Sequence, residues 1–325
     1  MTEIAPDLRL GLYETMLRIR RFEEETGALF AAGDLPGFVH LSIGQEAVAA
    51  GVCAALEPAD TITATHRGHG HIIAKGADLG RMMAELMGKR TGYCAGKGGS
   101  MHIFSLDLGV LGANGILGAG QPIAVGAGLS AKLLGEDRVS VTFFGEGASA
   151  QGAVHEAMNL AAIWKLPVVF VAEINGYAEL TPYAYHVSVP SMVDRAAGYG
   201  IPAARVDGSD VEAVYEAALA AVAQARATSS PVLLELRTQR WRGHFEGDRQ
   251  LYRPEGELEE VFRNDPLTLQ ADRLLAAGIV GQQLLDDLEQ RVADEIVEAV
   301  AFGKGSPEAA PEEALLHVYS SEIAS

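Results

Sequence analysis

Glu146 and Asn175 are the residues whose type and position point most directly to chemistry. Glu146 stands between two glycines that follow the apolar run VSVTFF, and Asn175 comes directly after a second apolar run, VVFVAEI. Carboxylate and amide oxygens suit Mg²⁺, an ion that commonly bridges phosphate groups. Gly145 and Gly147 allow a sharp turn and a close approach of a ligand to the backbone. These residues therefore predict a site for a diphosphate and a metal ion.

Two strands joined by a helix would position this pair. Residues 139–144 and 166–174 are apolar and rich in β-branched side chains, which predicts two buried strands. Between them, apolar side chains recur at helical spacing: Val154, Ala157, Ala161 and Trp164. Because a βαβ unit has parallel strands and a right-handed crossover, Glu146 and Asn175 are expected at carboxyl ends of strands, where open α/β sheets bind ligands. The helix start between them would offer free N–H groups to an anion. Many α/β proteins use the same pattern as a structural turn, so the residues alone leave both interpretations open.

A second group of candidates follows the predicted strand at residues 61–65, where the sequence reads HRGHGH. Three histidines, at positions 66, 69 and 71, could bind zinc. Zinc sites usually add cysteine or carboxylate ligands, together with groups that orient them. Arg67 and the following Lys75 instead favour an anion, because arginine forms bidentate contacts with phosphate. His40 is a further candidate, since histidine is the usual proton carrier near neutral pH.

Two glycine-rich segments extend the list of candidates. Residues 96–102, GKGGSMH, are glycine-rich and basic but lack the P-loop pattern GxxxxGK[ST]. Residues 112–120, GANGILGAG, favour a tight turn that packs against a helix. Neither segment identifies a ligand by itself.

The combination of these motifs resembles a known family. Gly145-Glu146-Gly147 and Ile174-Asn175 resemble the thiamine diphosphate motif, in which GDG is followed after a fixed interval by NN. The sequence between and around them is similar to the alpha subunit of the decarboxylating component of 2-oxoacid dehydrogenase complexes, and the similarity covers most of the chain. The stretch HFEGD at residues 244–248 is similar to the branch of this family that acts on acetoin, because Phe245 replaces the serine of the eukaryotic pyruvate enzymes.

The resemblance implies roles for individual residues. His40 and His244 would be catalytic, and Glu146, Asn175 and the Tyr177 backbone carbonyl would bind Mg²⁺. The segment at 96–102 would be an ordered loop near the cofactor. Residues that bind thiamine diphosphate would be His66, Arg67, Gly115, Leu117, Gly145, Glu146, Gly147, Ala148, Asn175, Tyr177 and His244.

Two positions depart from the family motif. Glu146 replaces aspartate, so its carboxylate reaches about 1.5 Å further toward an ion that requires octahedral geometry at ~2.1 Å. Ile174 replaces the first asparagine of NN, whereas the second, which supplies the ligand in the family, is kept as Asn175. Metal ligation is therefore the part of the resemblance that these two departures affect most.

The resemblance also implies partners. In this family a beta subunit supplies the glutamate that activates the cofactor, so the chain is expected to be inactive alone and to form a heterotetramer of two alpha and two beta subunits. The two-carbon product of acetoin cleavage would pass to a lipoyl-bearing acyltransferase. The alternatives are a dehydrogenase for pyruvate or another 2-oxo acid, a carboligase without a lipoyl partner, and a regulatory subunit without cofactor.

Composition restricts the remaining possibilities. The chain has 325 residues and a net charge of −18, which argues against nucleic acid or an anionic membrane as partners. No apolar run approaches the ~20 residues of a membrane helix, and the start MTEIAPDL lacks signal-peptide features. With only two cysteines and no CxxC, we expect reduced thiols and a cytoplasmic location.

The predicted fold class is α/β, with a mostly parallel sheet flanked by helices and a helical C-terminal extension. A helix is expected over residues 7–32 and another over 211–227, with further strands near 203–206 and 231–236. Residues 178–191 are expected to form a loop that acts as a lid or a subunit contact. We expect residues 1–255 to form the diphosphate-binding domain and residues 256–325 to pack on it as helices.

Overall fold

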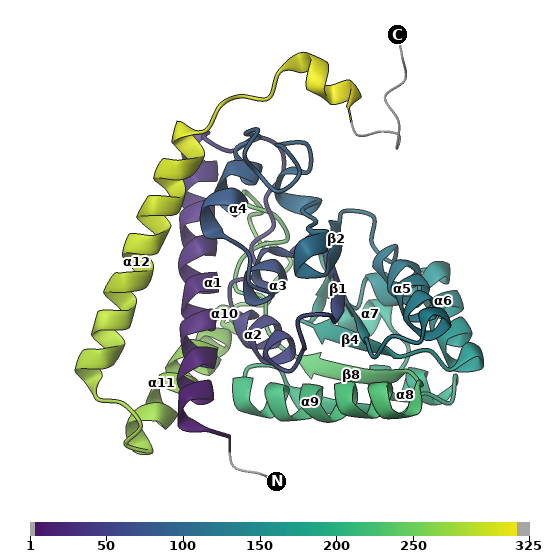
Figure 1. The fold of residues 1–325 in the computed structure, drawn as a ribbon. Helices are drawn as coiled ribbons and strands as arrows, with labels where there is room; N and C mark the ends of the chain where they lie inside the picture. Colours follow the sequence, from purple (N-terminus) through teal and green to yellow (C-terminus); the bar gives the residue numbers. More distant parts are fainter. Residues whose placement is uncertain (1–3, 317–325) are drawn as a thin grey trace.

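A single parallel sheet forms the centre of the protein (Figure 1). The computed structural model describes residues 4–316. In this part of the chain the strand order is β2-β1-β3-β4-β8-β7, and every neighbouring pair is parallel. The strands are β1 (Thr61–Thr65), β2 (Val110–Asn114), β3 (Ser140–Phe144), β4 (Val168–Ile174), β7 (Ala203–Asp207) and β8 (Val232–Arg237). The predicted α/β class is thus confirmed.

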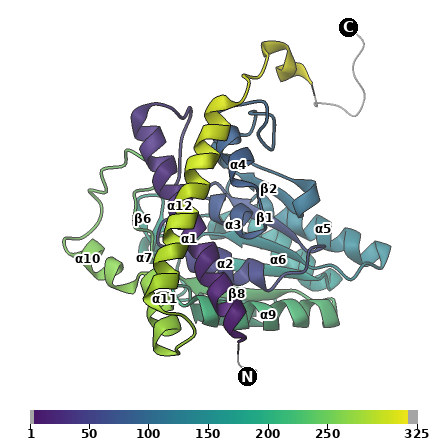
Figure 2. The same cartoon turned by 60° about the vertical axis from the view of Figure 1, so that its left-hand side comes forward.

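Helices cover both faces of the sheet (Figure 1, Figure 2). On one face lie α5 (Gly120–Leu134) and α6 (Gly152–Trp164), and on the other lie α2 (Glu46–Ala54) and α9 (Val211–Thr228). The long helix α1 (Pro6–Ala32) packs on α2 and on α12 (Gln282–Gly305). The remaining helices are α3 (His69–Ala74), α4 (Leu79–Leu86), α7 (Tyr183–His186), α8 (Met192–Ala197), α10 (Glu257–Val261) and α11 (Pro266–Ala276).

Strand β4 shows why the central strands read as continuous apolar runs. Val169 and Val171 join the core formed with α1, α2 and α9, whereas Phe170 and Ala172 join the core formed with α5 and α6. All seven residues of β4 are buried, because successive side chains point to opposite faces and both faces are covered.

One sequence-based expectation about this sheet is wrong. Residues 112–114, expected in a turn, belong to the edge strand β2, whose glycine and polar residues hide the strand pattern. The helix expected between Glu146 and Asn175 is present as α6, which begins at Gly152. Between Gly147 and α6, Ala148–Ala150 form a 3-10 turn and Gln151 is extended.

The segment after β4 has more structure than a loop. Tyr177–Ala178 (β5) and Thr181–Pro182 (β6) form a short antiparallel hairpin that leads into α7. Its function as a lid or a subunit contact stays a prediction.

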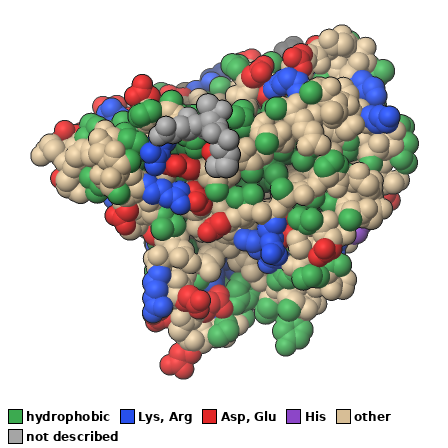
Figure 3. Space-filling view, turned by 90° about the horizontal axis from the view of Figure 1, so that it is seen from below, with side chains coloured by type: hydrophobic (Ala, Val, Ile, Leu, Met, Phe, Trp, Pro, Cys, Tyr) green, Lys and Arg blue, Asp and Glu red, His purple; other side chains and the backbone are tan. Residues whose placement is uncertain are grey.

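The C-terminal helices return to the start of the chain. Helix α11 packs on α1, α12 packs on α4 and α1 (Figure 2), and Glu308 forms an antiparallel bridge with Lys89. The predicted boundary at residue 255 stays a prediction, and residues 317–325 of the expected extension lie outside the described residues. Within residues 4–316, no helix combines the length and apolar character that crossing a membrane requires. On the face seen in Figure 3, acidic and basic side chains are interspersed rather than separated by sign.

A tight turn between α1 and α2 brings residues 40–46 to the carboxyl edge of the sheet. Gly44 adopts a left-handed conformation, with φ of +93°. A Cβ at this position would lie 2.2 Å from Cδ1 of Trp241 and 2.5 Å from the carbonyl oxygen of Gln239. Only glycine therefore allows this turn to pack against the segment that follows β8.

We predict that Gly44→Ala destabilises the protein more than Gly33→Ala. Gly33 has a similar φ of +82°, but nothing lies within 4 Å of its added Cβ, so this control isolates the backbone cost of about 1–2 kcal/mol. Gly44→Ala should cost about 1–3 kcal/mol more, because Trp241 must move. Unfolding in urea measures both losses, and equal losses would contradict the packing role of Gly44.

Candidate functional site

A pocket opens at the carboxyl edge of the sheet, where the neighbouring strands β1, β3, β4 and β8 end. Segments distant in sequence meet there because all of these strands run in the same direction. The residues that line the pocket are Gln45, Thr65, His66, Arg67, Leu117, Gly145, Glu146, Gly147, Ala148, Glu173, Asn175, Tyr177, Ala178, Glu179, Arg240 and His244. Most of the residues predicted from the sequence are therefore brought together, and His40 lies beside His66 and His244.

Glu146 and Asn175 meet in this pocket as the βαβ unit predicts. The Glu146 side chain is buried, and its Oε1 accepts a hydrogen bond of 2.7 Å from the Gly176 N–H. Asn175 Oδ1 accepts the Tyr177 N–H at 3.2 Å, and its Nδ2 donates to Gln45 Oε1 at 3.0 Å. Burial raises the pKa of Glu146, with the Arg240 charge opposing this shift. A buried carboxylate beside amide and backbone oxygens is a donor set that fits a hard cation such as Mg²⁺.

Three imidazoles form the opposite part of the site. The ring centroid of His40 lies 4.7 Å from that of His66 and 5.0 Å from that of His244. Within residues 4–316, His40 Nδ1 and both ring nitrogens of His66 are buried without a hydrogen-bond partner. Burial and the nearby Arg67 charge lower the pKa of His40 to about 3 and that of His244 to about 4. These imidazoles are therefore neutral near pH 7 and are free to hydrogen-bond to a ligand.

The three imidazoles also have the spacing of a metal site, since one nitrogen from each lies within 4.8 Å of the others. This set differs from the three histidines of the HRGHGH segment, of which only His66 takes part. His69 instead pairs with Glu23, and His71 pairs with Glu173. The positive charges of Arg67 and Arg240, which lower the pKa of His66 further, oppose a dication at this position. The cluster therefore suits an organic ligand better than a metal ion.

Arg67 is buried and uses its guanidinium to hold the backbone. Its Nη1 donates to the carbonyl of Leu41, and its Nη2 donates to the carbonyl of His244 at 2.8 Å. Arg67 thereby joins the segments that carry His40 and His244, and its bidentate contact with a phosphate stays a prediction. Lys75, expected to help bind an anion, lies elsewhere and donates to the Glu57 carbonyl at 3.2 Å, so this expectation is wrong.

The glycine-rich segments contribute less than expected. Leu117 lines the pocket, but Gly115 does not, and its nearest side chain is His102. In residues 96–102, the N–H groups of Gly96, Gly98 and Gly99 donate to the Glu85 carboxylate at 2.9, 2.7 and 3.1 Å. This segment is an ordered loop whose backbone donors are used inside the protein.

Gln45, Glu173 and Arg240 line the pocket but were not predicted from the sequence. Glu173 could have been singled out from the sequence, because a carboxylate inside the apolar run VVFVAEI must have a buried partner. In the structure that partner is His71, whose Nε2 lies 3.1 Å from Glu173 Oε2. Gln45 and Arg240 gave no comparable signal, since both lie in polar connections.

The chain is similar to known proteins over most of its length. A family model described as "Dehydrogenase E1 component" matches residues 14–312. The acetoin:2,6-dichlorophenolindophenol oxidoreductase alpha subunits of Bacillus subtilis and Cupriavidus necator are 52% and 50% identical to this chain. Each match covers 96% of the chain and 93% or 94% of the relative. A pyruvate dehydrogenase E1 alpha subunit of Zymomonas mobilis is 44% identical over 94% of the chain and 86% of the relative.

We predict that the neutral imidazoles make the protein lose stability as the pH falls from 6.5. A histidine in the unfolded chain has a pKa near 6.5. Below that pH, His40 and His244 are protonated in the unfolded chain but stay neutral in the folded protein, which favours unfolding. The loss continues down to the folded pKa values of about 4 for His244 and about 3 for His40, at up to about 1.4 kcal/mol per pH unit for each group.

His40→Asn should therefore reduce the loss of unfolding free energy between pH 7 and pH 5, as measured in urea. His102→Asn removes an exposed imidazole and serves as the control. A His40→Asn protein with the same pH dependence as the unmodified protein would show that His40 is not kept neutral by the fold.

Proposed function

Because the chain belongs to the dehydrogenase E1 component family, we propose that it is the alpha subunit of a thiamine diphosphate-dependent acetoin dehydrogenase. The observation that carries this proposal is the meeting of Glu146, Asn175, Arg67, His66 and His244 in one pocket, with His40 beside the two imidazoles. That pocket combines oxygen ligands for a cation with a buried positive charge for an anion. A regulatory subunit without cofactor would have no use for so many uncompensated polar groups.

The residues of this chain fit thiamine diphosphate and Mg²⁺. Glu146, the Asn175 side chain and the Tyr177 backbone carbonyl would hold the metal ion, and Arg67 would compensate negative charge on the diphosphate. Gly147 fits a narrow passage, because a Cβ there would lie 3.3 Å from Cβ of Ala178. His66, Leu117, Gly145 and Ala148 would contact the cofactor. Gly115 would act only indirectly, through the backbone that leads to Leu117.

When bound, thiamine diphosphate supplies a nucleophilic carbon that attacks a carbonyl and permits cleavage of the adjacent C–C bond. The chain itself would exclude water and handle protons. His40 Nδ1 is buried and has no partner in the described residues, so it can accept a hydrogen bond from a substrate hydroxyl. Neutralisation of Arg67 by a bound anion would raise the pKa values of His40 and His244 toward the range that suits proton transfer.

The substrate class is supported by the relatives. Identity is higher to the two acetoin oxidoreductase subunits than to the pyruvate dehydrogenase subunit. The pyruvate dehydrogenase activity remains the second candidate because that relative is also similar over most of its length.

The proposed partners rest on the resemblance to the family and on the names of the relatives. A beta subunit would supply the activating glutamate, and the two would form a heterotetramer with two copies of each. A lipoyl-bearing acyltransferase would accept the two-carbon unit. The relatives are themselves named as alpha subunits, which supports the need for a second subunit.

We predict activity on acetoin only when the chain is combined with a beta subunit encoded beside it. The purified complex should reduce 2,6-dichlorophenolindophenol with acetoin faster than with pyruvate, and the isolated chain should be inactive. A faster rate with pyruvate would favour the second candidate. A carboligase would form acyloins from aldehydes without needing the dye. Full activity of the isolated chain would contradict the proposal.

We also predict that Glu146 binds the metal ion. Glu146→Asp should retain cofactor binding, because the shorter side chain matches the family motif. Glu146→Ala should raise the Mg²⁺ concentration needed for half-maximal binding of thiamine diphosphate by at least about 10-fold. Glu156→Ala, which removes an exposed carboxylate from α6, is the control. An unchanged Mg²⁺ requirement in Glu146→Ala would exclude the carboxylate as a ligand.

A further inference from the structure

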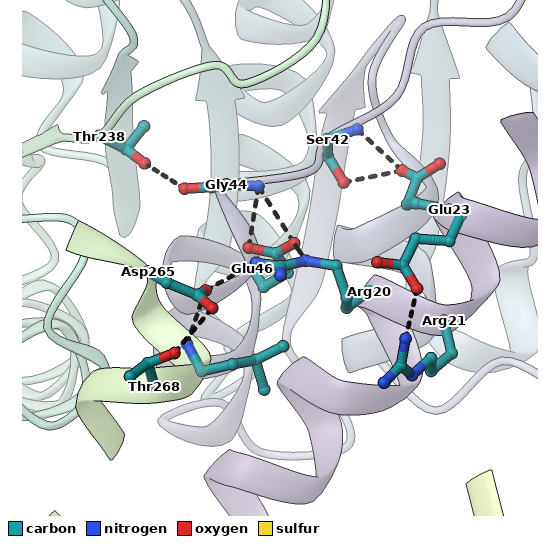
Figure 4. A network of polar contacts seen from close by, with 11 residues as sticks. Arg20, Arg21, Glu23, Ser42, Gly44, Glu46, Thr238, Asp265 and Thr268 are labelled. Atoms are coloured by element: carbon teal, nitrogen blue, oxygen red, sulfur yellow. Dashed lines mark hydrogen bonds and ion pairs between the residues drawn. The ribbon is translucent and has the colours of Figure 1, made fainter. Parts of the chain in front are cut away.

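Helix α1 carries a carboxylate that the proposed function leaves unused. Glu23 lies outside the pocket and is completely buried. Its Oε1 accepts two hydrogen bonds from Ser42, at 3.0 Å from the N–H and 2.7 Å from the hydroxyl (Figure 4). Its Oε2 lies 2.9 Å from Nδ1 of His69. A buried charge is costly unless it is well paired, so this arrangement calls for an explanation.

The partners of Glu23 lie next to the residues of the site. Ser42 follows His40 by two positions, and His69 follows Arg67 by two positions. The other nitrogen of His69, Nε2, lies 2.9 Å from Oγ of Ser100 in the loop at residues 96–102. One carboxylate therefore ties together the segment that carries His40, the segment that carries His66 and Arg67, and this loop.

The charge of Glu23 is maintained by these contacts. Burial alone would raise the pKa of Glu23, but the His69 imidazole and the two Ser42 donors outweigh it and lower the pKa. An ionised Glu23 accepts hydrogen bonds only, which fixes Nδ1 of His69 as a donor and leaves Nε2 to face Ser100. The contacts thereby fix one orientation of the His69 ring.

A second buried pair, between Arg20 of α1 and Glu46 of α2, holds a different part of the turn. Arg20 donates to Glu46 at 2.5 Å, and Glu46 accepts the N–H of Gly44 at 3.0 and 3.1 Å (Figure 4). This pair fixes Gly44, whereas Glu23 fixes Ser42. Of these two sets of contacts, the one on Ser42 lies closer in the chain to His40, beside the Leu41 carbonyl that accepts from Arg67.

We propose that Glu23 is a positioning residue that sets the place of His40 relative to His66 through its hydrogen bonds to Ser42 and His69. This inference rests on the proposed function, because it assigns His40 a role in turnover. Neither His40 nor His66 has a hydrogen-bond partner of its own on the nitrogens that are buried, within the described residues. Their places therefore depend on the backbone that carries them.

Glu23→Gln in the two-subunit complex tests this proposal. The amide keeps the shape of the side chain but can no longer accept at both oxygens. We expect the turnover number with acetoin to fall by about 10-fold to 100-fold, since small displacements of reacting groups have effects of this size. The Michaelis constant and the affinity for thiamine diphosphate should change little. Glu24→Gln, which alters the neighbouring, partly exposed carboxylate that pairs with Arg21, should retain normal turnover.

A double-mutant cycle separates positioning from a general loss of structure. In a His40→Asn background, Glu23→Gln should lower turnover only slightly further, because its effect passes through His40. Equal losses in both backgrounds would overturn the proposal. If Glu23→Gln fails to fold, Ser42→Ala, which removes one hydrogen bond and keeps Glu23, should give the same pattern with a smaller loss. If Ser42→Ala lowers turnover by the same factor with and without His40→Asn, the proposal is also overturned.

A measurement without cofactor distinguishes this proposal from the proposed function. The rate at which diethyl pyrocarbonate modifies His40, followed by mass spectrometry of the cofactor-free protein, should rise several-fold in Glu23→Gln or Ser42→Ala and not in Glu24→Gln. An unchanged rate would overturn the positioning role even if acetoin is the substrate. A raised rate in a protein without dehydrogenase activity would support the positioning of His40 and reject the proposed function.

Discussion

The buried positive charge of Arg67 is the constraint on which the site depends. A guanidinium with almost no exposure to water must find acceptors, and here it donates to the backbone carbonyls of Leu41 and His244. Burial, together with this charge, keeps the imidazoles of His40 and His244 neutral, as their lowered pKa values indicate. Across the pocket, Glu146 is a buried carboxylate with a raised pKa. An anion near Arg67 and a cation near Glu146 would offset the free-energy cost of burying these two charged groups. A diphosphate with a metal ion provides both charges.

The site needs a rigid support because most of its residues lie on connections between elements. Parallel strands bring the connections to one edge, but they do not fix the side chains. Helix α1 supplies part of that support through Arg20 and Glu23, which act on the turn that carries His40 and Gln45 (Figure 4). A helix that contributes nothing to the lining of the pocket thus influences its geometry through buried ionic contacts.

The sequence was informative where hydrophobic pattern and topology act together. Glu146 and Asn175 could be placed at one edge because two apolar runs joined by a helix leave little choice of topology. The sequence was less informative where the position of a polar side chain depends on the residue with which it pairs. The three histidines of HRGHGH are equivalent by type and spacing, yet His66 faces the pocket while His69 and His71 pair with buried glutamates from α1 and β4. Gln45 and Arg240 reach the pocket from polar connections whose course depends on the completed fold. The sequence left the first residue of α6 and the preceding 3-10 turn undefined, because helical spacing of apolar residues does not fix the first turn of a helix.

Anomalous diffraction from the two-subunit complex, with thiamine diphosphate and Mn²⁺ in place of Mg²⁺, tests the central claim most directly. The claim is that this chain binds a diphosphate and a metal ion between the ends of β3 and β4. It predicts one manganese peak in the pocket, within bonding distance of Glu146 and Asn175 and at about 2.0–2.2 Å from oxygen ligands. A peak among His40, His66 and His244, or bound cofactor with no peak beside Glu146, would contradict it.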